Sequence, residues 1–260
     1  MKVSGLALFH WQKVQPAGRE AVMKLEGTVA LVTGANRGLG KALVAALVEA
    51  GAARVYAAAR DTEKLSVADP RVVPVPLDIT RPDQIADAAR RAGDVTLLIN
   101  NAGALSSYNL LASSQVDLEA DFRTNVHGTL AVIKAFLPVL ERATGGATVV
   151  NVLSLTSLAS FPALGGYSAS KAAAYSVTQA LRPELRARRI ELLAVLPGPI
   201  DTDMVKALQM PKSSPADAAR GVLAGIARGE EEIFPDPMAQ QMGALWMGSP
   251  KEFERAFASF

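Results

Sequence analysis

Tyr167 and Lys171 stand four residues apart in an alanine-rich stretch that is typical of a helix. At this spacing two side chains share one face of a helix. A lysine ammonium beside a phenol favours the phenolate, so the lysine is expected to lower the tyrosine pKa from its usual value near ~10. A tyrosine tuned in this way can exchange a proton with a carbonyl or alcohol oxygen near neutral pH. Ordinary half-exposed helix faces carry the same spacing, so the pair takes its meaning from the rest of the chain.

A glycine-rich segment with the spacing Gly-x-x-x-Gly-x-Gly joins the first apolar run to the first helical stretch. Gly34 suits a tight turn, Gly38 lets the backbone approach a pyrophosphate, and Gly40 allows a helix to pack closely on a strand. A helix that begins here offers unpaired N–H groups and the positive end of its dipole to phosphates. The segment therefore predicts a dinucleotide site.

Further motifs accompany this segment. Asn-Asn-Ala-Gly ends a later apolar run at residues 100–103, Ser154 lies 13 residues before Tyr167, and a Pro-Gly segment covers residues 197–202. With these motifs the chain resembles the short-chain dehydrogenase/reductase family, over roughly Lys24 to Phe260. The resemblance implies an oxidoreductase with a nicotinamide coenzyme.

The resemblance also implies a catalytic group of four side chains. Tyr167 would be the general acid in reduction and the general base in oxidation, and Lys171 would lower its pKa and bind the nicotinamide ribose. Ser154 would orient and polarise a substrate carbonyl. Asn125 would hold a water that links Lys171 to solvent. Each has a plain structural alternative: Ser154 could satisfy backbone groups in its Ser/Thr-rich loop, and Asn125 could bridge a helix to a strand.

The coenzyme residues implied by the resemblance come from six segments of the chain. Asp78 stands where family members touch the adenine, although it could instead be an N-cap for the helix after Thr80. The implied set is Gly34, Asn36, Arg37, Gly38, Leu39, Gly40, Arg60, Asp78, Ile79, Asn101, Ala102, Gly103, Tyr167, Lys171, Pro197, Gly198, Ile200 and Thr202.

The end of the second expected strand favours NADP(H) over NAD(H). NAD sites usually place an acid there to bind the ribose 2′-hydroxyl, but Ala59 holds that position and Arg60 follows it. Arg37 can reach the same place, and arginine matches a phosphate with a planar fork of donors. Two alternatives stay open: Arg60 could pair with Asp61 or Glu63 on the surface, or Asp61 could bind the ribose.

Apolar runs alternate with helical stretches, which predicts a single-domain α/β fold with a doubly wound parallel sheet (a Rossmann fold) and helices on both faces. Thr80 is expected to cap the second helix. The expected strands are 29–32, 54–59, 72–77, 95–99, 147–153, 190–196 and 232–234. The expected helices are 38–50, 82–92, 116–142 and 167–188, with two more opening at 214 and 249. Residues 23–260 form the expected domain, and residues 1–22 are an extension or an arm that packs on a partner.

Composition narrows the function further. The 260 residues include no cysteine and two histidines, so a metal site is not expected. A net charge of +2 with scattered basic residues argues against nucleic acid. No apolar run reaches the ~18 residues of a membrane span. We expect a cytoplasmic protein, and the resemblance implies a homodimer or homotetramer built on the helices that begin near Val116 and Tyr167.

The substrate is the least determined feature. Pocket walls are expected from residues 104–108, residues 155–164 and the Met- and Leu-rich residues 204–210, which favour an apolar ketone, aldehyde or secondary alcohol. A non-catalytic coenzyme-binding sensor or scaffold is the alternative, as is epimerisation or dehydration on the same fold. Another apolar group is expected in the core or an interface: Phe234, Met238, Met242, Trp246 and Met247.

Overall fold

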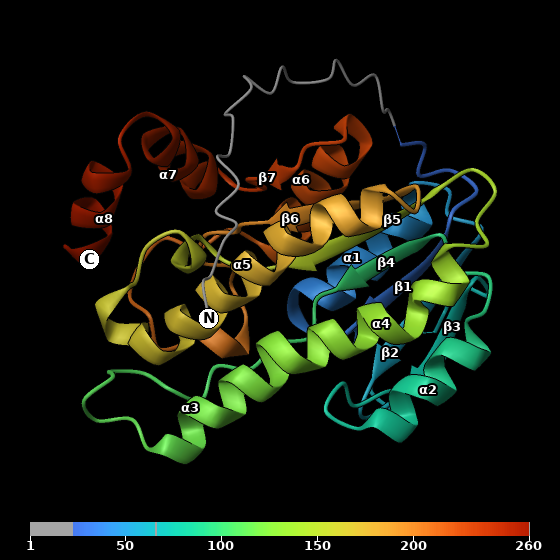
Figure 1. Ribbon diagram of the computed structural model, residues 1–260, viewed down its shortest axis with the longest axis horizontal. Coiled ribbons are helices and arrows are strands. Elements are labelled where there is room, and N and C mark those ends of the chain that lie inside the picture. Colours follow the sequence, from blue (N-terminus) through green and yellow to red (C-terminus); the bar gives the residue numbers. More distant parts are fainter. Residues whose placement is uncertain (1–22, 66, 260) are drawn as a thin grey trace, which may run out of the picture.

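Parallel strands form a seven-stranded sheet in a computed structural model that describes residues 23–65 and 67–259. The order is β3-β2-β1-β4-β5-β6-β7, so the chain winds outward from β1 in both directions (Figure 1). The strands are β1 Val29–Thr33, β2 Arg54–Ala59, β3 Val72–Pro76, β4 Leu97–Asn100, β5 Ala147–Val152, β6 Ile190–Val195 and β7 Glu232–Ile233. This topology confirms the predicted doubly wound α/β fold.

Helices cover both faces of the sheet. Helices α1 and α6 pack together on one face, and α2, α4 and α5 lie on the other (Figure 1). The helices are α1 Gly38–Glu49, α2 Pro82–Arg91, α3 Gln115–Phe122, α4 Thr129–Leu140, α5 Gly165–Arg186, α6 Pro215–Arg228, α7 Pro237–Gly248 and α8 Pro250–Ala258. Short 3-10 turns η2 Leu155–Ser157, η3 Pro162–Leu164 and η4 Asp203–Val205 lie between them, and a π-helix, η1 Arg123–Gly128, joins α3 to α4.

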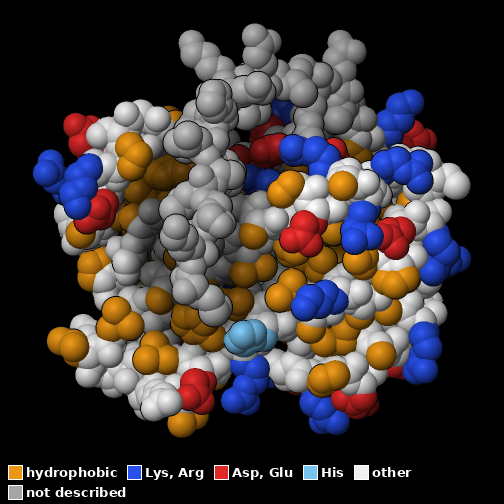
Figure 2. Space-filling model, viewed as in Figure 1, with side chains coloured by type: hydrophobic (Ala, Val, Ile, Leu, Met, Phe, Trp, Pro, Cys, Tyr) orange, Lys and Arg blue, Asp and Glu red, His pale blue; other side chains and the backbone are white. Residues whose placement is uncertain are grey.

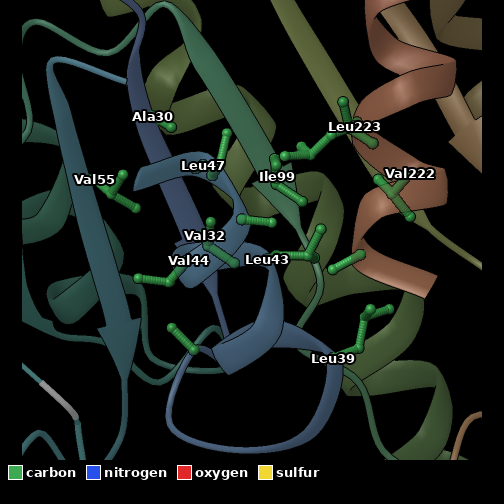
Figure 3. Close-up of a cluster of buried hydrophobic side chains, with 14 of the residues drawn as sticks. Ala30, Val32, Leu39, Leu43, Val44, Leu47, Val55, Ile99, Val222 and Leu223 are labelled. Atoms are coloured by element: carbon green, nitrogen blue, oxygen red, sulfur yellow. The ribbon is translucent and has the colours of Figure 1, made fainter. Parts of the chain in front are cut away.

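The central strands β1, β4 and β5 are buried along nearly their whole length because both faces of the sheet are covered. Successive residues of a strand point to opposite faces. Val32 therefore packs with Leu43 of α1 and Val222 of α6 on one side (Figure 3). Its neighbour Leu31 packs with Phe136 of α4 on the other side. Both strand residues are fully buried, and burial of such side chains typically contributes ≈ 1.5–3 kcal/mol each.

Three details of the sequence prediction are wrong. The expected helix over 116–142 is not one α-helix, because the π-helix η1 interrupts it. Thr80 does not cap α2: Arg81 is the N-cap residue and makes no side-chain cap, and the Thr80 hydroxyl donates to Asp78 instead. Helix α7 was not expected at all, although Asp236 caps it and a proline follows.

The molecular surface mixes both signs of charge. On the face seen in Figure 2, basic and acidic side chains are interspersed and form no continuous basic stripe. No helix within residues 23–65 and 67–259 combines the length and apolar character needed to cross a bilayer. The extension expected at residues 1–22 lies outside the described residues.

Candidate active site

The segment between β1 and α1 forms a cradle at the carboxyl end of the sheet. Gly34 and Gly38 have φ of +67° and +54°, a region where side chains other than glycine are strained. Arg37, the N-cap residue of α1, makes no side-chain cap, and the first turn holds no acidic residue. The N–H groups and the positive dipole end of α1 are thus not neutralised by a side chain of their own helix, which fits a bound phosphate.

The Asn-Asn-Ala-Gly segment holds this cradle to β4. Asn101 donates from its side-chain amide to the Thr33 carbonyl at 2.9 Å and to the Gly34 carbonyl at 3.3 Å. The Thr33 hydroxyl accepts backbone N–H bonds from Asn101 at 3.0 Å and Ala102 at 2.9 Å. A Cβ at Gly40 would collide with the Gly34 carbonyl, so this close approach of helix and loop requires glycine.

A cavity of about 1250 Å³ opens above this cradle and extends along the carboxyl ends of the strands. All coenzyme residues predicted from the sequence line it, as do Ser154, Tyr167 and Lys171, whereas Asn125 is not among the lining residues. Lys41 and Lys64 also line it and were missed by the sequence analysis. The cavity is large enough for a dinucleotide and a small substrate together.

Basic side chains gather at the end of the cavity beside β2. Ala59 ends the strand and Arg60 is exposed behind it. Asp61 pairs with Lys64 at 2.8 Å, and in the described part of the chain Arg60 pairs with neither Asp61 nor Glu63. The surface pairing of Arg60 considered from the sequence is therefore wrong, and the Asp61 carboxylate is held by a lysine.

Arg37, in the glycine segment, also lines the cavity. Its guanidinium pairs with Asp203 of η4 at 3.3 Å, and both side chains are more than 60% exposed. The residue expected to reach a 2′-phosphate thus contacts the segment after β6 in this structure. An exposed pair of this kind contributes little, ~0–1 kcal/mol, so an incoming anion can exchange with Asp203 at small cost.

Asp78 is held by its own loop. Its carboxylate accepts bonds from the Thr80 N–H at 2.8 Å and hydroxyl at 2.7 Å, and its N–H donates to the Gln84 side chain. Burial raises the pKa of Asp78, but the bonds from Thr80 and the charges of Arg60 and Arg81 outweigh burial and leave the pKa below its usual value. Since Arg81 is the N-cap residue of α2, the alternative that Asp78 is that N-cap is wrong.

Tyr167 and Lys171 share one face of α5, as the sequence spacing predicts, and that face is buried. The Lys171 amine stands 5.7 Å from the centre of the Tyr167 ring and donates to the Val152 carbonyl at 3.0 Å. Ser154, from the loop after β5, hydrogen-bonds the Tyr167 phenol. Its hydroxyl also accepts from the Thr156 N–H at 3.1 Å. Serine and tyrosine hydroxyls therefore meet on the cavity wall.

The expected lowering of the tyrosine pKa is not what this structure produces. Burial raises the pKa of Tyr167 well above its usual value, the bond from Ser154 opposes this, and the charge of Asp121 adds to it. Burial lowers the pKa of Lys171 to about 8, and Asp121 partly counters this effect. Loss of water favours the neutral form of both groups. The predicted lowering is wrong because it counted the charge of Lys171 and not the burial of Tyr167.

Asn125 lies in the π-helix η1, and π-turns are frequent at functional sites. Its side-chain oxygen accepts from the Ala104 N–H and its amide donates to the Ala104 carbonyl, both at 2.9 Å. The amide also donates to the Ser170 hydroxyl at 2.9 Å. The side chain ties the loop after β4 to α5.

The far end of the cavity has apolar walls. Residues from each expected wall line it, but from residues 104–108 only Ala104 does so, and Tyr108 is 53% exposed. Met238 packs against a buried cluster, as expected, and also lines the cavity. Met242 is buried as expected, whereas Met247 is 69% exposed. The apolar lining residues at this end are Leu155, Phe161, Leu164, Met204, Val205, Leu208, Met210, Met238 and Phe257.

Two residues that support this site carried no recognised motif. Asp236 caps α7 and accepts from the Gly198 N–H at 2.8 Å, which holds the Pro-Gly segment in place. Asp236-Pro237 has the same order of cap residue and proline as Ser214-Pro215 at the start of α6, so the sequence did contain a signal for α7. Phe257 of α8 reaches the cavity from the end of the chain, and nothing in the sequence indicates that contact.

A phosphate cradle, a dinucleotide-sized cavity and a Ser-Tyr-Lys group define a nucleotide-dependent oxidoreductase of the doubly wound class. Comparison with known proteins places the chain in the same class. The model of the short chain dehydrogenase family matches residues 28–212, and the chain belongs to that family.

Three relatives illustrate the similarity. The chain is 31% identical to an uncharacterized oxidoreductase of Staphylococcus aureus, across 78% of this chain and 93% of the relative. A short chain dehydrogenase from Burkholderia cenocepacia, solved in complex with NADP, is 42% identical with a TM-score of 0.85, covering 90% of this chain and 99% of that one. A 3-ketoacyl-(acyl-carrier-protein) reductase from Brucella melitensis, complexed with NADH, is 26% identical with a TM-score of 0.72, covering 83% and 93%.

Proposed function

We propose that this protein reduces an uncharged, apolar ketone or aldehyde with NADPH. The observation that carries the proposal is the position of the Ser154–Tyr167 pair between the glycine cradle and the apolar end of the cavity. A carbonyl at this point meets two hydroxyl groups, with the coenzyme on one side and an apolar wall on the other. Such a site is suited to hydride transfer.

The residues have complementary roles in this reaction. When bound, the nicotinamide supplies the hydride to the carbonyl carbon. Ser154 polarises the carbonyl oxygen, and Tyr167 donates the phenolic proton to it, so the product is an alcohol. The raised pKa of Tyr167 keeps it a neutral phenol, the form that reduction requires. Lys171 binds the nicotinamide ribose and passes a proton back to the phenolate.

Preference for NADPH is supported by the charges at the ribose end. Arg60, Lys41 and Lys64 line the cavity, as does Arg37, whose exposed partner Asp203 can be replaced by an anion. The strand ends in Ala59, which offers no acceptor to a 2′-hydroxyl. The relative from Burkholderia cenocepacia holds NADP, although the Brucella reductase holds NADH.

An acyl-carrier-linked 3-ketoacyl group is the second candidate substrate, because one relative carries that name. The apolar end of the cavity supports a free, uncharged ketone instead. A panel of aliphatic, aryl and acyl-thioester ketones, followed by loss of NADPH absorbance, separates the two. Tight NADPH binding without turnover of any ketone or alcohol would favour a coenzyme-binding sensor.

Replacing Tyr167 by Phe tests the catalytic assignment. The substitution removes one hydroxyl at a buried site, so turnover of the best ketone should fall at least a hundredfold, in line with the usual contribution of a general acid. NADPH binding, measured by its fluorescence, should persist. Turnover within a few-fold of the wild type would contradict the proposed chemistry.

We further propose that the chain forms a homo-oligomer through α4 and α5. Partly buried apolar side chains lie on both helices, among them Ala131, Leu137, Ala173 and Val177. Apolar side chains gather over this region in Figure 2. Light scattering of the purified protein measures the oligomeric state.

A further inference from the structure

Asp121 is a fully buried carboxylate just before the π-helix, and the residue is 0% exposed. Three donors reach it. The Ser106 N–H donates to Oδ1 at 2.7 Å, and the Ser107 N–H and hydroxyl donate to Oδ2 at 3.0 and 2.5 Å. A buried carboxylate is costly unless it is well bonded, so a site that retains one has a specific use for it.

Asp121 and Asn125 lie four residues apart and hold the same loop. The Asn125 side chain bonds to the N–H and the carbonyl of Ala104. The Asp121 carboxylate accepts from the N–H groups of Ser106 and Ser107, a little further along the loop. Together they clamp the segment that leaves β4 after the Asn-Asn-Ala-Gly motif. Ala104 lines the cavity, so the clamp sets the wall beside the coenzyme and substrate.

The clamped loop rests on the start of the catalytic helix. A Cβ at Gly166 would collide with the Ser107 hydroxyl, and the Gly166 N–H donates to the Tyr108 carbonyl at 3.3 Å. Gly166 immediately precedes Tyr167. Asp121 therefore reaches the catalytic tyrosine through one layer of loop, which places its charge within electrostatic range of α5.

We propose that Asp121 is a positioning residue of the reductase site: it holds the loop 104–107 against α5 and places a buried negative charge behind that loop. The inference rests on the proposed function. Arg123, on the same helical stretch as Asp121, lines the cavity and is exposed. The charge of Asp121 acts on two titratable groups of α5, Tyr167 and Lys171, and the Ser106 and Ser107 donors of the loop bind its carboxylate.

The charge of Asp121 acts on the pKa of Lys171 in one direction, upward. Burial lowers the pKa of Lys171 to about 8, and Asp121 raises it against that effect. Without the carboxylate, Lys171 loses its proton at lower pH, and its bond to the ribose and its proton return to Tyr167 both weaken. A residue that only shaped the loop would leave this titration unchanged.

Asp121→Asn removes the charge at nearly constant volume and sets its amide NH2 against a donor of Ser106 or Ser107, so Ser107→Ala below isolates the loss of a bond. We expect kcat to fall about tenfold, the alkaline limb of the kcat profile to move about one unit toward lower pH, and the Kd of NADPH to stay within about twofold. Glu119→Gln removes an exposed carboxylate from the same helix and is the matched control, with no change in the limb. A profile of Asp121→Asn that overlays the wild type overturns the proposal.

Ser107→Ala separates the loop from the charge and serves if Asp121→Asn does not fold. It removes one donor and keeps the carboxylate, so the KM of the ketone should rise about fivefold while the alkaline limb stays in place. An unchanged KM overturns the positioning role.

A wild-type protein that turns over no carbonyl would overturn the proposed function and leave the charge of Asp121 testable. The pH dependence of unfolding then decides. In each background, the free energy of unfolding is compared between the chain that keeps Lys171 and its Lys171→Met variant. This difference changes with pH as Lys171 titrates. The change should occur at lower pH in the Asp121→Asn background than in the wild-type background. Equal midpoints would overturn the inference by itself.

Discussion

Lys171 is a buried amine whose protonation is linked to the stability of the folded chain. Its pKa is lowered to about 8 by burial, against an ordinary value of 10.5. Between these values the unfolded chain binds more protons than the folded one, so stability rises with pH across this window. Below pH 8 both states bind the proton. The folded chain then carries the full free-energy cost of burying a charged amine, about 3 kcal/mol. The site therefore carries a destabilised lysine at neutral pH.

Lys171→Met should remove this linkage. Urea unfolding between pH 7.5 and pH 9.5 should show the wild type gaining about 2 kcal/mol, while the variant gains none from this group. The window stays below the onset of ordinary tyrosine ionisation near pH ~10. Lys251→Met, at an exposed position of α8, is the control and should follow the wild type. Parallel curves for wild type and Lys171→Met would show that burial does not shift this amine.

At the scale of elements, the sequence predicted the strands well. An apolar run bounded by glycine and polar residues can be recognised from neighbouring residues alone. Strand β2 coincides with its expected range, and β4 is displaced by about two residues. The π-helix η1 could not be seen, since its sequence contains no proline and no glycine before Gly128 to mark a change of helix type. Helix α7 was missed because its Met- and Trp-rich stretch lacks the polar face that marks an amphipathic helix.

The same distinction separates the site residues. Ser154, Tyr167 and the glycines stand in short motifs, so spacing alone pointed to them. Asp121 and Phe257 owe their positions to contacts between segments far apart in the sequence. The position of Asp121 depends on the loop after β4, and that of Phe257 on the ring of Phe161, 5.9 Å away. Such contacts exist only after the sheet has brought the segments together.

Helix α8 closes the apolar end of the cavity with one aromatic side chain. Phe257 lines the cavity and contacts Phe161 edge to face, while Phe253 stacks on Phe257 at 5.0 Å and is fully buried behind it. An aromatic contact of this kind is worth about 0.5–1.5 kcal/mol beyond burial. The ring should therefore favour flat, bulky ketones over small ones.

Phe257→Leu should lower kcat/KM for an aryl ketone about two- to tenfold relative to a short aliphatic ketone. Phe253→Leu removes the same ring from the same helix without touching the cavity. It should reduce stability and leave the substrate ratio unchanged. If both variants change the ratio equally, α8 acts through packing and not through contact with substrate.

At the scale of the whole molecule, the coenzyme cavity joins the two halves of the sheet. The glycine segment after β1 supplies one wall and the Pro-Gly segment after β6 supplies the other, with the Thr202 methyl 2.9 Å from the Cβ position of Gly38. Asp236 fixes the second wall to α7. A dinucleotide bound here contacts both halves, so it binds the folded chain and not the unfolded one. Binding then stabilises the entire fold by mass action.

NADPH at 100 times its Kd should add about 2.7 kcal/mol to the free energy of unfolding. For a chain of this size each kcal/mol corresponds to roughly 2–4 °C in Tm. Arg60→Ala removes a charged donor from the ribose end, and bonds to charged groups contribute ≈ 1.5–3 kcal/mol. At the same NADPH concentration the variant should lose at least half of the shift, whereas the smaller shift from NADH should be unchanged.

Arg90→Ala removes an exposed arginine from α2, away from the cavity lining, and controls for the loss of charge. It should keep both shifts. If Arg60→Ala reduces the NADPH and NADH shifts in equal proportion, Arg60 does not recognise the 2′-phosphate, and coenzyme preference must come from Arg37 or the two lysines. Arg37 must leave Asp203 of η4 to bind a phosphate. If Arg37 recognises the 2′-phosphate, a disulfide engineered between η4 and the glycine segment should hold the Arg37–Asp203 pair together. The Tm shift from NADPH should then fall.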